Sequence, residues 1–513
     1  MVLKVRTISM INKYIVIGFI SFYIAITLLV GMMASVKRQN IEMYFLAGRR
    51  LGPVMLAFSF SATAMSGLLF FGFSGMFFES GLQNLWLLIS SGIVGILLCY
   101  YLVSKKIRLY SERTGALTVI ELLKNRYGDS ERYLARITAM IIIVSTVLYV
   151  SGQLIAMAKL MDIFIGLPYE TSIIIFASVI VTYTVMGGFK AVCWTDVFQG
   201  ISMVLACLLV GSVVWRINSG FSQLWLNMTI INQSDSQFYI SPFATPSNIL
   251  LGVTLFLGDG IMSWIGQPTL MTRYMSLRKI GDFGQAKKLS VLFQMILFAG
   301  VVLASFHMRT QYFEASMLPM GEDMETVFIQ FFLTYMNPLL GGVVLGGIIA
   351  AIISTADSLI ILASSIWAND IYGSKNQHAT PEKLIWVSKI TTLLIGLIVV
   401  LISFNIHTVL LVAWTGWTML GIVGVPLIVG MYWKRATLRG AICAEIAGVA
   451  TLILWVAFDL TGKLSIFYAF PAGVVSYLSI FLVSWFDKSP PDYIQQEIAD
   501  LNRNYEYESK ARI

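Results

Sequence analysis

LGPVMLAFSFSATAMSGLLFFGFSGMFF, residues 51–78, is the stretch that decides the fold. It is long enough to cross a bilayer, because about 20 apolar residues suffice. Its middle, residues 59–67, is nevertheless rich in Ser, Thr, Ala and Gly. Small residues let helices approach closely, and hydroxyls can satisfy backbone groups that are freed where a helix unwinds. We interpret the stretch as a broken membrane helix with a ligand site at the break; the alternative is an intact helix packed through its small residues.

The composition of the whole chain is that of a membrane protein. Of its 513 residues, 57% are hydrophobic and 12% are charged, whereas an ordinary globular domain has about 25% charged residues. The net charge of +8 is best explained by basic loops that face anionic lipid headgroups. Membrane lipid is therefore an expected partner and nucleic acid is not. The four cysteines form no CxxC pair, which argues against a zinc site.

The apolar stretches number about thirteen, which predicts an all-α polytopic membrane protein. They run roughly over residues 13–34, 52–78, 83–103, 132–163, 168–186, 192–216, 249–272, 287–307, 335–368, 384–404, 408–432, 440–460 and 464–486. In this count the basic loops 104–136, 273–288 and 433–439 share one side, opposite the acidic loop 314–325. Basic loops stay in the cytoplasm. We therefore expect a plasma-membrane protein, in the inner membrane of a bacterium, with its N-terminus outside and its C-terminus inside.

A second interrupted span follows five helices after the first. GVTLFLGDGIMSWIGQPTLMTRYM, residues 252–275, contains a Gly-Asp-Gly at 258–260 and a further interruption at Gly266 and Pro268. Two interrupted spans at corresponding places in two halves indicate an inverted-repeat transporter with its site near the middle of the membrane. The repeats then cover spans two to six and seven to eleven.

The ninth span carries a polar face. Ala351, Ser354, Thr355 and Ser358 are spaced so that they share one side of a helix. Hydroxyl and carbonyl oxygens suit a hard cation. The alternative is that these hydroxyls only form hydrogen bonds between helices.

Three carboxylates lie in or beside spans: Asp196, Asp259 and Asp357. An ionised carboxylate in the middle of a bilayer costs about 3 kcal/mol, so such residues are functional candidates. Asp196 has two further interpretations, a pair with a nearby base or a water-exposed helix end. Asp259 would suit a ligand that carries an amino group.

Six motifs resemble the sodium/solute symporter family, and most of all its bacterial sodium/proline symporter branch. They are YFLAGRRLGP (44–53), SATAMSG (61–67), YTVMGGFKAVCWTD (183–196), IGQPTLMTRYM (265–275), ISTADSLIILASS (353–365) and YWKRATLRGA (432–441). The similarity extends over roughly residues 13 to 490 and implies a 5+5 inverted-repeat core of the leucine-transporter type. The expected segments are a peripheral N-terminal helix and loop (1–51), the first repeat (52–218), an extracellular loop (219–248), the second repeat (249–433), two peripheral helices (434–486) and a cytoplasmic tail (487–513).

The resemblance also implies ligand positions. The common sodium site of the family falls on the carbonyls of Ala62, Met65 and Ala351 and the hydroxyls of Ser354 and Thr355. A second sodium site, described in some members, would use Asp196, Ser354, Thr355 and Ser358. Asp357 stands where relatives with that site have a hydroxyl, so a second sodium is an open alternative here. The expected substrate contacts are Phe60, Ala64, Ser66, Tyr149, Gln153, Gly260, Trp264 and Trp414, with Trp414 and Trp417 as a hydrophobic gate.

The predicted function is sodium-coupled symport. The coupling ion is sodium, and the cargo is a small organic solute, an amino acid or a related compound, carried by alternating access. Alternatives that remain open are a sugar, sialic-acid or carboxylate cargo, and a solute sensor that acts with a separate signalling partner. We expect neither an enzyme nor an obligatory protein partner.

Overall fold

The computed structural model describes residues 10–34, 41–84, 86, 93–234, 238–241, 243–376 and 378–510. The described part is helical and has no strand beyond two isolated bridges. In the first half the main helices are α1 (Met10–Ala34), α2 (Ile41–Leu46), α3 (Pro53–Ala64), α4 (Ser74–Ser80), α6 (Gly95–Leu98), α7 (Lys105–Thr114), α8 (Val119–Tyr127), α9 (Tyr133–Ile165), α10 (Tyr169–Ile217) and α11 (Phe221–Ser234). In the second half they are α12 (Pro246–Leu255), α13 (Pro268–Met275), α14 (Phe283–Gln311), α15 (Val327–Tyr335), α16 (Pro338–Ile366), α17 (Pro381–Ser403), α18 (Val409–Tyr432), α19 (Leu438–Ala457), α20 (Leu460–Leu464), α21 (Ala469–Phe486) and α22 (Asp492–Lys510).

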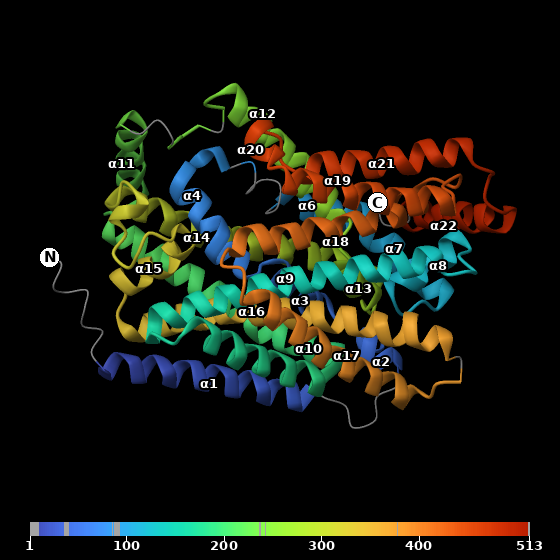
Figure 1. Cartoon of the computed structure of the whole chain (residues 1–513), viewed down its shortest axis with the longest axis horizontal. Coiled ribbons are helices and arrows are strands. Elements are labelled where there is room, and N and C mark those ends of the chain that lie inside the picture. The colour runs from blue at the N-terminus through green and yellow to red at the C-terminus, as the bar shows by residue number, and fades with distance from the viewer. Residues whose placement is uncertain are drawn as a thin grey trace.

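The helix starts follow from local chemistry. Proline stands in the first turn of α3, α12, α13, α16 and α17, where its missing N–H breaks no helical hydrogen bond. Thr or Asn side chains accept the hydrogen bond of a free N–H at the start of α8, α12, α16, α17, α18 and α19. Most of the helices run along the long axis of the molecule (Figure 1).

The long apolar helices form a membrane-spanning bundle. Among the described residues nine helices are long and apolar enough to cross a membrane, and ten if the bent pair around residue 65 counts as one span. Shorter apolar helices cover residues 17–33 and 169–182. The expected span 83–103 lies partly outside the described residues, and so do the residues 1–9 that begin the chain. The total of about thirteen spans therefore stays a prediction.

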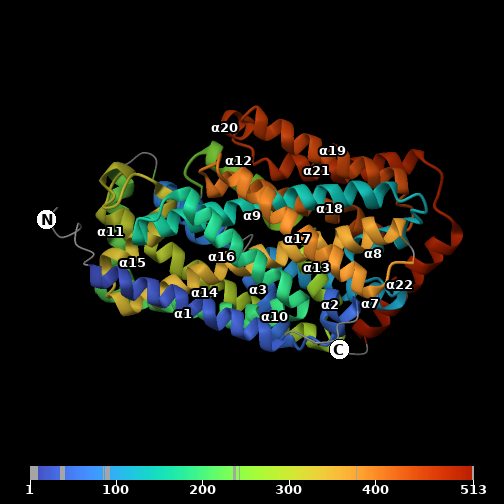
Figure 2. The same cartoon turned by 60° about the horizontal axis from the view of Figure 1, so that its bottom comes forward.

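The peripheral helices flank a central group. The helix α1 lies along one side, against α10 and α16, while α19 and α21 pack together on the opposite side (Figures 1 and 2). Between them α9 packs on α18, and α10 packs on α16 and α3. Helices from residues 52–218 thus interleave with helices from residues 249–433.

The first predicted break is confirmed. The helix α3 ends at Ala64, and Met65 has an extended backbone with φ −97° and ψ 91°. Helix resumes beyond Ser66, with a π-helical segment η3 (Leu69–Phe73) that leads into α4. The two parts are bent by 60°.

The second interruption is partly different from the prediction. Residues 258–260 do not unwind; they belong to a π-helical segment, η7 (Phe256–Ser263), that continues α12. A Cβ on Gly258 would lie 2.4 Å from the backbone nitrogen of Phe470 on α21, so this glycine permits close helix packing. The chain leaves the helical path further on, at Gln267, whose ψ is 114°. Only the interruption at Gly266 and Pro268 is therefore a break.

The end of the chain is also more ordered than its polarity suggests. Residues 487–513 are expected as a tail, but residues 492–510 form α22. Ile494, Ile498 and Leu501 are buried, and Asn502 accepts a hydrogen bond from the Lys106 ammonium at 2.5 Å. The i, i+4, i+7 spacing of these three residues is the pattern of an amphipathic helix.

Candidate functional site

The break after α3 contacts the polar face of α16. The Ser354 hydroxyl donates to the carbonyl of Ala62 at 2.9 Å, and the Thr355 hydroxyl donates to the carbonyl of Thr63 at 3.0 Å. Ser354 also lies 3.2 Å from the carbonyl of Ala351. Ala62, Met65, Ala351, Ser354 and Thr355 are all buried. The predicted sodium ligands Ala62, Ala351 and Ser354 therefore form one cluster of oxygens, with Thr355 beside it and Met65 at the break itself.

Gln153 satisfies the opened backbone. Its side-chain oxygen accepts a hydrogen bond from the N–H of Gly67 at 2.9 Å, and the Ser66 hydroxyl accepts from the N–H of Leu68 at 3.0 Å. Unpaired backbone groups are costly at membrane depth. Gln153, on α9, thus stabilises the break.

A cavity lies on the other side of the break. Its lining consists of Ala64, Met65, Ser66, Leu68, Leu69, Phe73, Tyr149, Asp259, Trp264, Trp414 and Trp417. These residues come from α3, η3, α9, η7, α18 and the residues just beyond α3 and η7. Both interrupted spans therefore contribute to the same cavity, as expected for a binding site between two repeats.

Aromatic rings form the wall of this cavity. Trp417 contacts Trp264 and Tyr149, with ring centroids 5.2 and 6.0 Å apart. Phe73 contacts Trp414 at 5.1 Å. The indole N–H of Trp414 donates to Asp259 Oδ1 at 2.7 Å. The carboxylate is thereby held between α18 and η7, and it is 2% exposed.

The cavity includes most of the predicted substrate contacts. Ala64, Ser66, Tyr149, Trp264 and Trp414 line it, whereas Phe60, Gln153 and Gly260 do not. Phe60 packs instead against the rings of Tyr100, Trp264 and Tyr274. Leu68, Leu69 and Phe73 were not expected there. An apolar residue in a membrane span has the same sequence signal whether it faces a cavity, a neighbouring helix or lipid.

Two of the three residues proposed for a second sodium, Asp196 and Ser358, contact an arginine. The Arg273 guanidinium lies 3.1 Å from Asp196 Oδ2 and donates to Ser358 at 2.8 Å. It also donates to Thr63 and, at 2.8 Å, to Ser59. Arg273 and Asp196 are 1% and 0% exposed. Of the two non-functional interpretations of Asp196, the structure supports the pair with a base and contradicts the water-exposed helix end. Asp357 is also buried, and its carboxylate accepts a 3.4 Å contact from the Ser358 hydroxyl.

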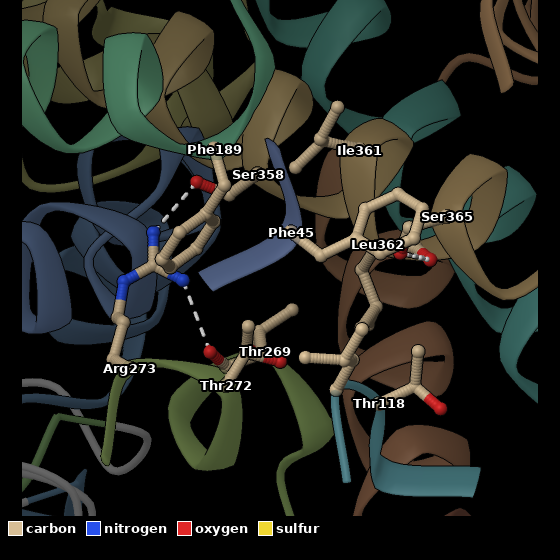
Figure 3. A pocket seen from close by; sticks show the side chains of 11 residues that line it. Phe45, Thr118, Phe189, Thr269, Thr272, Arg273, Ser358, Ile361, Leu362 and Ser365 are labelled. Carbon is tan, nitrogen blue, oxygen red and sulfur yellow. Dashed lines mark hydrogen bonds between the residues drawn. The ribbon is translucent and has the colours of Figure 1, made fainter. Parts of the chain in front are cut away.

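Arg273 borders a second cavity (Figure 3). The guanidinium reaches toward Ser358 beside the ring of Phe189, and Phe45 and Thr118 lie across the space from it. Of the residues that line it, Phe45 belongs to α2, and Leu117 and Thr118 come just before α8. These helices lie toward the end of the long axis opposite α15 (Figure 1). The hydroxyl of Ser358, which lines this cavity, also lies 3.0 Å from the Thr63 hydroxyl. Ser358 is one helical turn from Ser354 and Thr355 on α16.

Polar contacts of Glu325 join the loop before α15 to two neighbouring helices, at the end of the bundle opposite α2 and α8. Glu325, just before α15, accepts hydrogen bonds from the backbone N–H groups of Val409 and Leu410 at 3.0 and 2.8 Å. It also forms a 2.6 Å salt bridge with Lys159 of α9. The loop before α15 is thereby fixed to the first turn of α18 and to α9.

Both cavities are small. Each has a volume of about 20 Å³, which is room for about one or two waters.

The comparisons with known proteins agree with this geometry. The sodium:solute symporter family matches residues 44–448, and the chain belongs to that family. The high-affinity proline transporter of Bacillus subtilis (strain 168) is 29% identical over 483 residues, which cover 92% of this chain and 98% of the relative. The sodium/proline symporter of Escherichia coli (strain K12) is 28% identical over 503 residues, which cover 96% and 97%.

Solved structures confirm the fold class. A substrate-bound outward-open state of a Na⁺-coupled sialic acid symporter aligns with a TM-score of 0.72 at 20% identity, covering 94% of this chain and 99% of that one. A nucleobase-cation-symport-1 family transporter in a closed conformation aligns with a TM-score of 0.50 at 13% identity, covering 89% and 98%. The protein is a multi-pass, sodium-coupled symporter of a small organic solute, and it is not an enzyme.

Proposed function

We propose that the oxygen cluster between α3 and α16 binds the coupling sodium, with Ala62, Met65, Ala351, Ser354 and Thr355 as its ligands. The observation that carries this assignment is the pair of contacts from Ser354 and Thr355 to the carbonyls at the end of α3. A sodium ion would take over these oxygens once the hydroxyl protons rotate away. Carbonyl and hydroxyl oxygens are suitable ligands for a hard cation.

The cargo site is the aromatic cavity beside the break. Ala64 and Met65 both line this cavity. Met65 is also one of the proposed sodium ligands, so the cargo site and the sodium site meet at these residues. Sodium would connect α3 to α16 and thereby fix the shape of the break. A ligand shifts a conformational equilibrium only by its preference for one state. Sodium therefore favours the arrangement of the break that the cargo requires.

The cargo belongs to the amino acids or related amino-bearing compounds. The carboxylate of Asp259 favours a solute with a positive nitrogen, and the five aromatic rings favour an apolar body. Two of the relatives described above carry proline in their names. Proline itself is disfavoured here. The resemblance to proline symporters implies a pair of aromatic residues on the seventh span, and this chain has Trp264 in one of the two places and Gly260 in the other.

The membrane orientation completes the proposal. The C-terminus lies in the cytoplasm of a bacterial cell and the N-terminus lies outside, because the basic loops on the side of α7 and α8 stay inside. The two inverted repeats span residues 52–218 and 249–433. In this orientation the loop before α15 faces outward, and the cavity beside Arg273 is the route to the cytoplasm.

The test is thermal unfolding of the purified protein with amino acids, amines, sugars and carboxylates, each in sodium and in potassium buffer. A solute that raises the melting temperature only with sodium supports the proposal. That solute should then accumulate in proteoliposomes when an inward sodium gradient is imposed. Sodium-dependent binding without accumulation would instead favour a sensor.

A further inference from the structure

The charge carried by the lining of the aromatic cavity is negative. Asp259 is the one charged side chain among the eleven residues that line it, and neither Lys nor Arg nor His is among them. The position of the carboxylate is fixed, because Trp414 donates its indole N–H to Oδ1 at 2.7 Å. A solute that carries a carboxylate would therefore meet a like charge here, and the described residues that line the cavity would offer it no positive charge. Like charges in a site of low polarity repel strongly.

The backbone N–H groups of the broken helix do not replace the missing positive charge. A helix break can hold an anion through N–H groups that point into the site. Here the three N–H groups that follow the break have acceptors within the protein. That of Gly67 bonds to Gln153, that of Leu68 to the Ser66 hydroxyl, and that of Leu69 to the Ser66 carbonyl at 3.1 Å. An incoming carboxylate would have to displace these bonds.

The walls suit a cation. The rings of Phe73, Tyr149, Trp264, Trp414 and Trp417 surround the space next to Asp259. The faces of aromatic rings attract positive charge, and several rings around one carboxylate are a recurrent arrangement for ammonium and quaternary ammonium groups. A cation would thus gain from the carboxylate and from the rings together.

We propose that the cargo is a compact organic cation, an amine or quaternary ammonium compound without a carboxylate, whose charged nitrogen lies between Asp259 and the indole rings. This inference rests on the proposed function and narrows its substrate class from amino-bearing solutes in general. Uptake of such a cation with sodium moves one more positive charge per cycle than uptake of a zwitterionic amino acid with the same number of sodium ions.

The experiment compares matched probes on the purified full-length protein in sodium buffer. Choline is paired with 3,3-dimethylbutan-1-ol, its uncharged carbon analogue, and pyrrolidine is paired with proline. Binding is measured by thermal unfolding and by isothermal titration. We expect choline or pyrrolidine to bind at least about tenfold more tightly than its partner. Equal or tighter binding of the uncharged or carboxylated partner, or binding of neither cation, overturns the inference.

The outcomes separate this inference from the proposed function. Sodium-dependent binding of proline or another zwitterion would refute the cationic cargo and leave sodium-coupled symport standing. Binding that is the same in sodium and potassium would count against the sodium assignment instead. The first result comes from comparing ligands in sodium buffer, and the second comes from comparing sodium buffer with potassium buffer.

Variants of Asp259 test whether this carboxylate contacts the positive nitrogen of the cargo. Asp259→Asn should abolish the preference for the charged partner, while stabilisation by sodium alone persists and shows that the protein is folded. Asp259→Glu should restore part of the preference. Asp162→Asn, at an exposed position near the end of α9, is the control and should bind like the unchanged protein. A retained preference in Asp259→Asn would overturn the inference.

Discussion

Arg273 and Asp196 form a buried salt bridge, with Nη2 3.1 Å from Oδ2, at the place where the family resemblance allows a second sodium. Arg273 comes from α13, directly after the true break of the seventh span, and Asp196 comes from α10. The guanidinium donates to Ser59, Thr63 and Ser358 as well. In this conformation the Asp196 carboxylate is therefore neutralised by the protein's own cation. The bridge also joins a segment that follows the break to α10, which lies in the proposed first repeat.

Arg273→Gln should destabilise the folded protein by about 3–5 kcal/mol, because it leaves the Asp196 carboxylate buried without its counter-charge. The double variant Asp196→Asn/Arg273→Gln should recover part of that loss, since neither charge is then buried alone. Thermal unfolding in detergent measures both. An equal or larger loss in the double variant would show that the pair does not account for the effect.

The Arg273→Gln variant also tests whether sodium can bind in the place that the guanidinium occupies. With the guanidinium removed, sodium can reach Asp196 and Ser358, so sodium should stabilise Arg273→Gln more than it stabilises the unchanged protein. The sodium dependence should also become steeper. The measurement is the melting temperature as a function of sodium chloride concentration, with potassium chloride as the ionic-strength control. Unchanged steepness would exclude a latent second site.

Ser354→Ala and Thr355→Ala should each weaken the apparent sodium affinity of uptake about tenfold or more, since loss of one ligand or its support has an effect of this size in metal sites. The measurement is solute uptake as a function of sodium concentration, normalised to protein abundance. Ser305→Ala is the control, because this buried serine of α14 donates only to Val301 within its own helix in the described structure. Unchanged sodium dependence in both variants would refute the sodium assignment.

Glu325→Gln should favour opening at the α15 end. It removes the charge from bonds to Lys159 and to the first turn of α18, and hydrogen bonds to charged groups contribute about 1.5–3 kcal/mol. A cysteine introduced at Leu69, in a background without the four native cysteines, should react roughly tenfold faster with a membrane-impermeant maleimide.

Asp323→Asn is the matched control for that variant. Asp323 contacts the same Lys159 at 2.6 Å but its side chain is 46% exposed, and exposed ion pairs contribute at most about 1 kcal/mol. It should change the labelling rate little. Equal effects of the two variants would mean that the charge of Lys159, and not the attachment of Glu325 to α18, controls this end.

Gly266→Ala should prevent folding or reduce expression severely. A Cβ there would lie 1.9 Å from the carbonyl oxygen of Gly421 on α18, a backbone atom that cannot move aside without shifting the helix. Gly284→Ala, where nothing lies within 4 Å of an added Cβ, should be neutral or slightly stabilising. Expression and size-exclusion profiles of the two variants measure the contrast. A well-folded Gly266→Ala protein would contradict the packing.

The local features of the site could be predicted from the sequence because they depend on neighbouring residues. The break after Ala64 follows from a run of small and hydroxyl residues, and the oxygen face of α16 follows from the 3.6-residue period. The helix α22 could have been found from Ile494, Ile498 and Leu501. The predicted interruption at Gly258 and Gly260 is wrong, because both lie in a π-helical segment. Glycine has the same sequence signal whether it permits unwinding or, as at Gly258, close packing.

The sequence by itself determined the class of protein, its long apolar helices, the first break and the polar face of α16. Hydrophobic length and helical periodicity are local properties. The tertiary structure decided which cation neutralises Asp196, which helix satisfies the opened backbone of Gly67, and which rings share the cavity with Asp259. Each of these depends on how helices cross, and residues 77 and 86 positions apart meet only after packing. A long side chain such as that of Arg273 selects its partner from whatever the fold brings within reach.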